Sequence, residues 1–139
     1  MSEENKVSND MAEAEFERFA DAMDLDVNTS KMDNEDLTAF NKQKDRVTRA
    51  IEQGHLAIND DGEAVYTPHR PNSKYKEAIT FHERTGASLM AMDNRKKGHD
   101  VAKTYAVLAD MCKVPANVFA GLVGPDIKIC EALFALLMD

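Results

Sequence analysis

Apolar positions along the chain change their spacing several times, and each change predicts a different kind of element. Four apolar residues near the N-terminus lie three or four positions apart: Phe16, Phe19, Ala20 and Met23. This spacing predicts an amphipathic helix over residues 11–23, with an acidic opposite face. A helix this short needs a surface to pack on. Two outcomes are open, because it can fold back on the domain or dock on a partner.

A second helix is predicted to begin at Asp33 or Asn34, because either side chain can accept hydrogen bonds from the free amides of a first turn. Gly54 is a natural stop for this helix. Its apolar side is formed by Leu37, Phe40, Val47 and Ile51, and its C-terminal half carries the basic residues Lys42, Lys44, Arg46 and Arg49.

The next segment has the pattern of a β-hairpin. Leu56–Ile58 and Ala64–Tyr66 are short apolar runs on either side of Asp61 and Gly62. An Asp-Gly pair tolerates the positive φ angles of a tight hairpin turn, so two antiparallel strands are predicted. Residues 78–81 are a third candidate strand. A sheet this small needs a helix to cover its apolar face.

Helical spacing returns in the C-terminal part of the chain. A helix is predicted to start at Thr85 or Gly86, and a longer one covers residues 100–113. Pro115 can occupy the first turn of a short helix that follows. The last helix begins after Gly124, and its apolar stripe consists of Ile127, Cys130, Leu133, Phe134 and Leu137, widened by Ala132, Leu136 and Met138. We expect this helix to have more apolar surface than a small domain needs.

These elements predict a mostly helical α+β fold. It has a small two- or three-stranded antiparallel sheet, a C-terminal helical bundle and one or two N-terminal helices. Residues 1–33 are interpreted as an acidic tail with the short amphipathic helix. Residues 34–139 are interpreted as one α+β domain, with a helix over 34–53, the strands within 55–81 and the helical block over 86–139.

Composition narrows the classes of partner. The 139 residues include 43% hydrophobic positions and carry a net charge of −8, which argues against duplex nucleic acid as a partner because phosphate binding needs a basic face. No apolar run approaches the ~18 residues of a membrane span. The N-terminus has no apolar core of signal-peptide type. Cys112 and Cys130 lie in apolar helical patterns, so a reducing cytoplasm is expected.

Catalytic and metal-binding patterns are not found in the sequence. There is no glycine-rich phosphate loop and no nucleophile elbow, and burial would raise the pKa of both thiols. The chain is therefore predicted to be a non-enzyme without cofactor or metal. The four histidines are not spaced as zinc ligands; they are His55, His69, His82 and His99.

One acidic stretch resembles a calcium loop. Counted from Asp24, oxygen side chains fall at the first, third, fifth and twelfth positions of an EF-hand. However, Thr29 stands where the sharp turn requires glycine, and Lys31 stands where an apolar residue normally points inward. We interpret the stretch as an acidic linker that ends in a helix cap.

The C-terminal half has the element order of a known family. A strand ending in Thr80 and Phe81 is followed by a charged turn, a short helix with Leu89 and Asp93, a longer helix, a proline turn, and Asp126 just before a final apolar helix. Over residues 64–139 this resembles the tail assembly chaperones of long-tailed bacteriophages, in the group of small tail proteins related to that of phage Mu.

The resemblance implies a non-enzymatic protein in the host cytoplasm. Such chaperones bind the tape-measure protein, keep its apolar helices soluble and recruit tail-tube subunits. Self-association is plausible through exposed apolar helix surface. Methionine side chains suit such a surface, although they are also ordinary core residues. The set of candidate protein-binding residues includes both core and contact positions: Leu89, Met90, Met92, Tyr105, Leu108, Phe119, Leu133, Phe134 and Leu137.

Two alternative functions remain open at this stage. The first is a structural tail or head–tail adaptor that stays in the virion. The second is a small acidic regulator that binds a host protein through the amphipathic segment 11–23.

Overall fold

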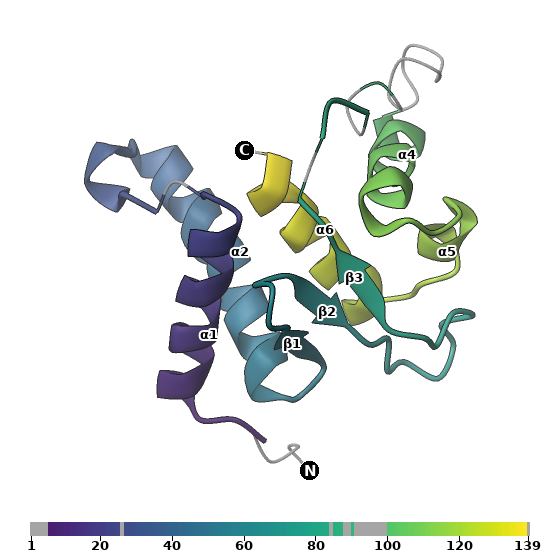
Figure 1. Ribbon diagram of the computed structural model, residues 1–139, viewed down its shortest axis with the longest axis horizontal. Coiled ribbons are helices and arrows are strands. Elements are labelled where there is room, and N and C mark those ends of the chain that lie inside the picture. Colours follow the sequence, from purple (N-terminus) through teal and green to yellow (C-terminus); the bar gives the residue numbers. More distant parts are fainter. Residues whose placement is uncertain (1–5, 26, 84, 88–89, 91–99, 139) are drawn as a thin grey trace.

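The computed structural model describes residues 6–25, 27–83, 85–87, 90 and 100–138. Within these ranges the chain forms a mostly helical α+β fold with one small antiparallel sheet, as the sequence predicts (Figure 1). No helix in the described ranges combines the length and apolar character needed to cross a bilayer.

The N-terminal part consists of helix α1 (Asn9–Ala22), a 3-10 turn (Thr29–Lys31) and helix α2 (Asn34–Glu52). The predicted start of α2 is confirmed, because the Asp33 side chain accepts a hydrogen bond from the Asp36 amide at 2.8 Å. Its predicted end is also confirmed, since Gly54 follows with φ of +81°, a conformation that favours glycine.

Helix α1 folds back on the domain. Phe16 and Phe19 are buried in the hydrophobic core, and α1 packs against α2 and the first strand. The guanidinium of Arg18 donates hydrogen bonds to the carbonyl oxygens of Ile58 at 2.8 Å and Asn59 at 3.1 Å. Of the two outcomes left open for the amphipathic stripe, the structure shows the first.

The sheet has the order β1-β2-β3 and is antiparallel throughout. Its strands are β1 (Leu56–Ile58), β2 (Ala64–Tyr66) and β3 (Ile79–Phe81). The hairpin prediction is confirmed to the residue. Gly62 in its turn has φ of +82°, and a Cβ there would lie 2.2 Å from the Cβ of Ala22 in α1. Glycine at this position therefore serves both the turn and the close approach of α1.

The C-terminal part contains α4 (Asp100–Cys112), α5 (Asn117–Ala120) and α6 (Pro125–Met138). These agree with the three predicted helices. Gly86, Ala87 and Met90 are helical, but the remainder of the helix predicted there, including Leu89 and Met92, lies outside the described residues.

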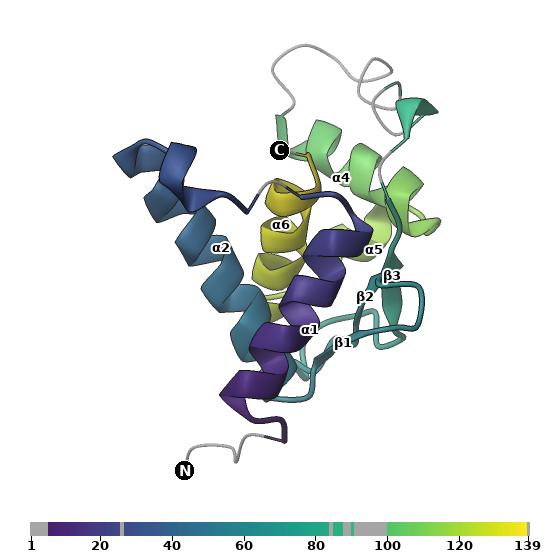
Figure 2. The ribbon, with the colours of Figure 1, turned by 60° about the vertical axis from the view of Figure 1, so that its left-hand side comes forward.

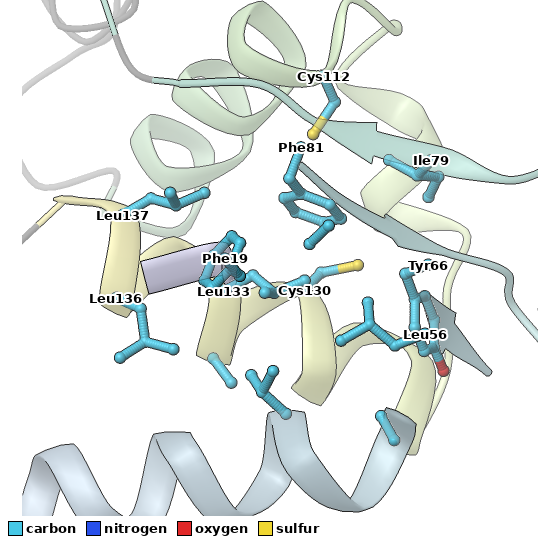
Figure 3. Packing of buried hydrophobic residues seen from close by; sticks show 14 of the residues in the cluster. Phe19, Leu56, Tyr66, Ile79, Phe81, Cys112, Cys130, Leu133, Leu136 and Leu137 are labelled. Atoms are coloured by element: carbon cyan, nitrogen blue, oxygen red, sulfur yellow. The ribbon is translucent and has the colours of Figure 1, made fainter. Parts of the chain in front are cut away.

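Helix α6 occupies the centre of the fold. It packs against α2 on one side (Figure 2). The buried side chains of Tyr66 and Phe81, from the sheet, lie toward its other side (Figure 3). In Figure 3, Leu133 lies toward Phe19 and Phe81, whereas Leu136 points toward α2. Its buried apolar residues therefore occupy more than one face: Cys130, Ala132, Leu133, Leu136 and Leu137.

The expectation of a surplus apolar surface on the last helix is wrong. Leu136 and Ala132, which widened the stripe, are 7% and 1% exposed, and Met138, the third residue that widened it, is half-buried. Helix α2 packs against α6 and lies on the side to which Leu136 points (Figure 3). A helix that is apolar on several sides belongs in the middle of a fold rather than at its surface.

Candidate functional site

The most organised polar group in the described chain is the buried carboxylate of Asp126. Both of its oxygens accept hydrogen bonds, so four donors converge on one side chain that has no exposed surface. The donors are the hydroxyl groups of Tyr66 and Ser73, each at 2.6 Å, and the backbone amides of His69 at 3.1 Å and Arg70 at 3.0 Å.

This network connects three parts of the chain. Asp126 lies in the first turn of α6, Tyr66 ends β2, and Ser73 belongs to the loop between β2 and β3. The Ser73 hydroxyl oxygen also accepts a hydrogen bond from the Val123 amide at 3.0 Å. Asp126 therefore holds residues 66–73 against the start of α6.

The electrostatics of the network favour an ionised carboxylate. Burial by itself raises the pKa of Asp126, but hydrogen bonds from Ser73, Tyr66 and the two amides outweigh it and hold the pKa below the ordinary 3.8. Burial and the neighbouring carboxylate raise the pKa of the Tyr66 phenol. A carboxylate enclosed in this way and unable to meet solvent is suited to stabilising the fold rather than to moving protons.

Both cysteine thiols are buried, and burial disfavours their ionised form. Burial raises the pKa of the Cys112 thiol to about 12, and burial with nearby carboxyl groups raises that of Cys130 well above its ordinary value. Such thiols are poor nucleophiles. His82, just after β3, pairs with Glu63, just before β2. In the described part of the chain, no group of three or more His, Cys, Asp or Glu residues is placed to hold a metal ion.

The structure separates the candidate protein-binding residues into three groups. Met90 is 68% exposed, and Tyr105 and Phe134 are half-buried. The remaining described members belong to the hydrophobic core: Leu108, Phe119, Leu133 and Leu137. Leu89 and Met92 lie outside the described residues, so most of the described candidates are core positions.

A further candidate surface for binding a protein lies on α2, outside the predicted protein-binding residues. The fully buried residues of α2 are Val47, Thr48, Ala50 and Ile51, all close to its C-terminal end. The N-terminal half, residues 34–43, buries none of its side chains completely. Figures 1 and 2 show this half extending away from the sheet.

A groove runs between the N-terminal half of α2 and the C-terminal part of α6. We call it the α2–α6 groove; its volume is about 420 Å³. Its apolar lining comes from both helices and from the preceding turn: Met32, Ala39, Phe40, Ala135 and Leu136. Polar and charged side chains complete it, namely Asn28, Lys31, Asp36 and Gln43.

A second hollow of about 430 Å³ lies on the other side of α2, against α1. Phe40 lines both hollows, and its ring packs edge-on against Phe16 with centroids 6.4 Å apart. The projecting half of α2 is thus flanked by accessible apolar surface on two sides. Leu37 and Phe40 in the predicted apolar stripe were the available signal, but the stripe does not show how far the helix extends beyond its support.

Comparison with known protein families, curated protein sequences and solved structures yields no match for this chain.

Proposed function

We propose that the protein is a phage tail assembly chaperone that binds apolar helices of a tape-measure protein without catalysing a reaction. The observation that carries the proposal is the α2–α6 groove. An apolar lining with polar edges is the arrangement by which proteins bind one face of an amphipathic helix. The tape-measure protein is proposed as the client because the order of strands, helices and Asp126 over residues 64–139 resembles that of tail assembly chaperones.

The client helix is expected to place its apolar side chains against Phe40 and Ala135, which are the accessible apolar side chains of α2 and α6 in the groove. Its polar flanks would meet Lys31 and Asp36, which have opposite charges and therefore accept a client edge of mixed charge. The net charge of −8 would keep the complex with an apolar client in solution. Recruitment of tail-tube subunits is part of the same proposal.

Of the two alternatives, the acidic regulator is not supported by the position of α1. That function needs the apolar stripe of residues 11–23 to be free for a partner, whereas Phe16 and Phe19 are buried in the domain core. A structural adaptor retained in the virion remains distinct in one measurable respect, because a chaperone is absent from purified particles and an adaptor is present.

Co-expression with the tape-measure protein of the same genome tests the proposal. The soluble fraction of the tape-measure protein is expected to rise with this chain and to return to its basal level with Ala39→Glu or Ala135→Glu. Both alanines are exposed and line the groove, so a carboxylate there blocks an apolar client without disturbing the core.

Thr38→Glu is the matched control. Thr38 is exposed on the same helix, one position away, and does not line the groove. The proposal fails if the wild-type chain leaves client solubility unchanged, or if Thr38→Glu lowers it as strongly as Ala39→Glu.

A further inference from the structure

A third cleft of about 430 Å³ lies farther along α2, between residues 42–53 and the first turn of α6. Its charge is unlike that of the whole protein. Four basic side chains line it, Lys42, Arg46, Arg49 and Lys128, and Asp45 is the single carboxylate among its described lining residues. This local excess of positive charge occurs in a chain with a net charge of −8.

The basic residues are brought together by helix geometry. Lys42, Arg46 and Arg49 are four and three positions apart, so they share one face of α2. Lys128 faces them from the start of α6. Within the described residues, none of the four side chains forms a salt bridge. Like charges at these spacings repel one another, and an anion bound among them would remove that repulsion.

The remaining wall supplies flat and apolar surface. The rings of His55 and His69 are stacked, with centroids 3.7 Å apart and planes 7° apart, and both residues line the cleft. Behind them, Nε2 of His69 lies 3.5 Å from a carboxylate oxygen of Asp126. The Asp126 network therefore fixes the loop that carries one side of the cleft.

We infer that this cleft binds a small phosphorylated ligand. Two arginine side chains offer planar pairs of donors that match phosphate oxygens, and two lysines add point charges. The volume lies in the range of small-molecule sites, and the positive charge is concentrated at one place. A compact, multiply charged anion fits that distribution better than carboxylates spaced along an extended acidic peptide. The site is separate from the α2–α6 groove and does not depend on the proposed chaperone function.

The test is a titration of the full chain at low ionic strength with inorganic pyrophosphate, followed by backbone amide chemical shifts and by calorimetry. The expected result is saturable binding, with the largest shifts at Arg46, Arg49, His69 and Lys128. Binding should weaken as salt is added, because exposed charges are screened. Tighter binding of ADP than of pyrophosphate would assign the ligand to the nucleotides, whereas equal or weaker binding would assign it to phosphate groups alone.

Two variants test the location of the site. Arg46→Gln with Arg49→Gln should weaken pyrophosphate binding by at least about tenfold, since two charge-assisted contacts are lost. Lys128→Gln removes an exposed charge from α6 and should also weaken pyrophosphate binding. This single variant tests the same site if the double arginine variant does not fold. Lys74→Gln with Lys113→Gln is the control, because both residues are exposed and lie outside the cleft.

Three results would overturn the inference. The first is the absence of saturable pyrophosphate binding. The second is an equal loss of affinity in the control variant, which would indicate attraction to positive charge in general. The third is tighter binding of a short oligoglutamate peptide than of pyrophosphate or ADP, which would assign the cleft to an acidic protein segment.

Discussion

Helix α6 and the N-terminal half of α2 use their apolar residues in opposite ways. Helix α6 has the more apolar sequence, and the fold buries it between α2 and the sheet. The N-terminal half of α2 is more polar, yet Leu37 and Phe40 remain partly accessible because this half extends beyond the core. The many apolar residues of α6 therefore reflect its burial in the core. The accessible apolar surface lies instead on the part of α2 that extends beyond the core.

The largest expected effect on folding stability comes from comparing an aspartate in the first turn of α6 with one in the first turn of α2. Asp126→Ala leaves four donors without their shared acceptor, and we expect it to cost about 3–5 kcal/mol of folding stability. Asp36→Ala, in the exposed first turn of α2, should cost at most about 1 kcal/mol, because only a helix-dipole interaction is lost. Urea unfolding measures both values. Equal costs would contradict the structural role assigned to Asp126.

The next effect compares one leucine from each region. Leu133→Ala opens a cavity in the core and should cost about 2–5 kcal/mol. Leu37→Ala removes a half-buried side chain from the projecting part of α2 and should cost less than about 1 kcal/mol. Both are read from the midpoint of chemical unfolding at constant m-value. A cost for Leu37→Ala close to that for Leu133→Ala would place the projecting half in the core.

The dependence of stability on pH gives a smaller effect. Since the pKa of Asp126 is lower in the folded state than its ordinary 3.8, its contribution is fully present above that value and is lost as the pH falls through the folded pKa. Over that interval the slope attributable to this group is at most about 1.4 kcal/mol per pH unit. Asp126→Asn should remove this part of the slope. An unchanged acid profile in that variant would show that other carboxyl groups, such as Glu63, control acid unfolding.

The smallest expected effect on stability is that of Ala39→Glu. The alanine is exposed and glutamate is a good helix former, so the free energy of unfolding should change by no more than about 0.5 kcal/mol. Thermal unfolding of the purified variant provides the measurement. A large destabilisation would mean that position 39 belongs to the fold, and its loss of client binding would then carry no information about the groove.

Local signals predicted the element boundaries well. The Asp61–Gly62 turn, the Asp33 cap and the Gly54 stop each act through the backbone within a few residues, so the sequence around them contains the necessary information. The bounds of the two hairpin strands and the limits of α2 agree with the prediction.

Contacts between elements that are distant in the chain could not be predicted from the sequence. The buried role of Asp126 depends on donors more than fifty positions away in the chain. The apolar stripe of α6 does not reveal that α2 covers its second side, and the stripe of α2 does not reveal that only its C-terminal half is supported. The sequence could not divide the candidate set into core and contact positions, and the structure places Leu108 and Leu133 in the core. The groove at Ala39 and Ala135 was not predicted.

Hydrogen exchange of the complex with a tape-measure protein tests the central claim most directly, namely that the client helix occupies the α2–α6 groove. In the free protein, amides in the N-terminal half of α2 should exchange faster than those of residues 47–52. Binding should slow exchange mainly over residues 34–43 and 132–138. A complex in which these two segments exchange as in the free protein, while another surface becomes protected, would contradict the account.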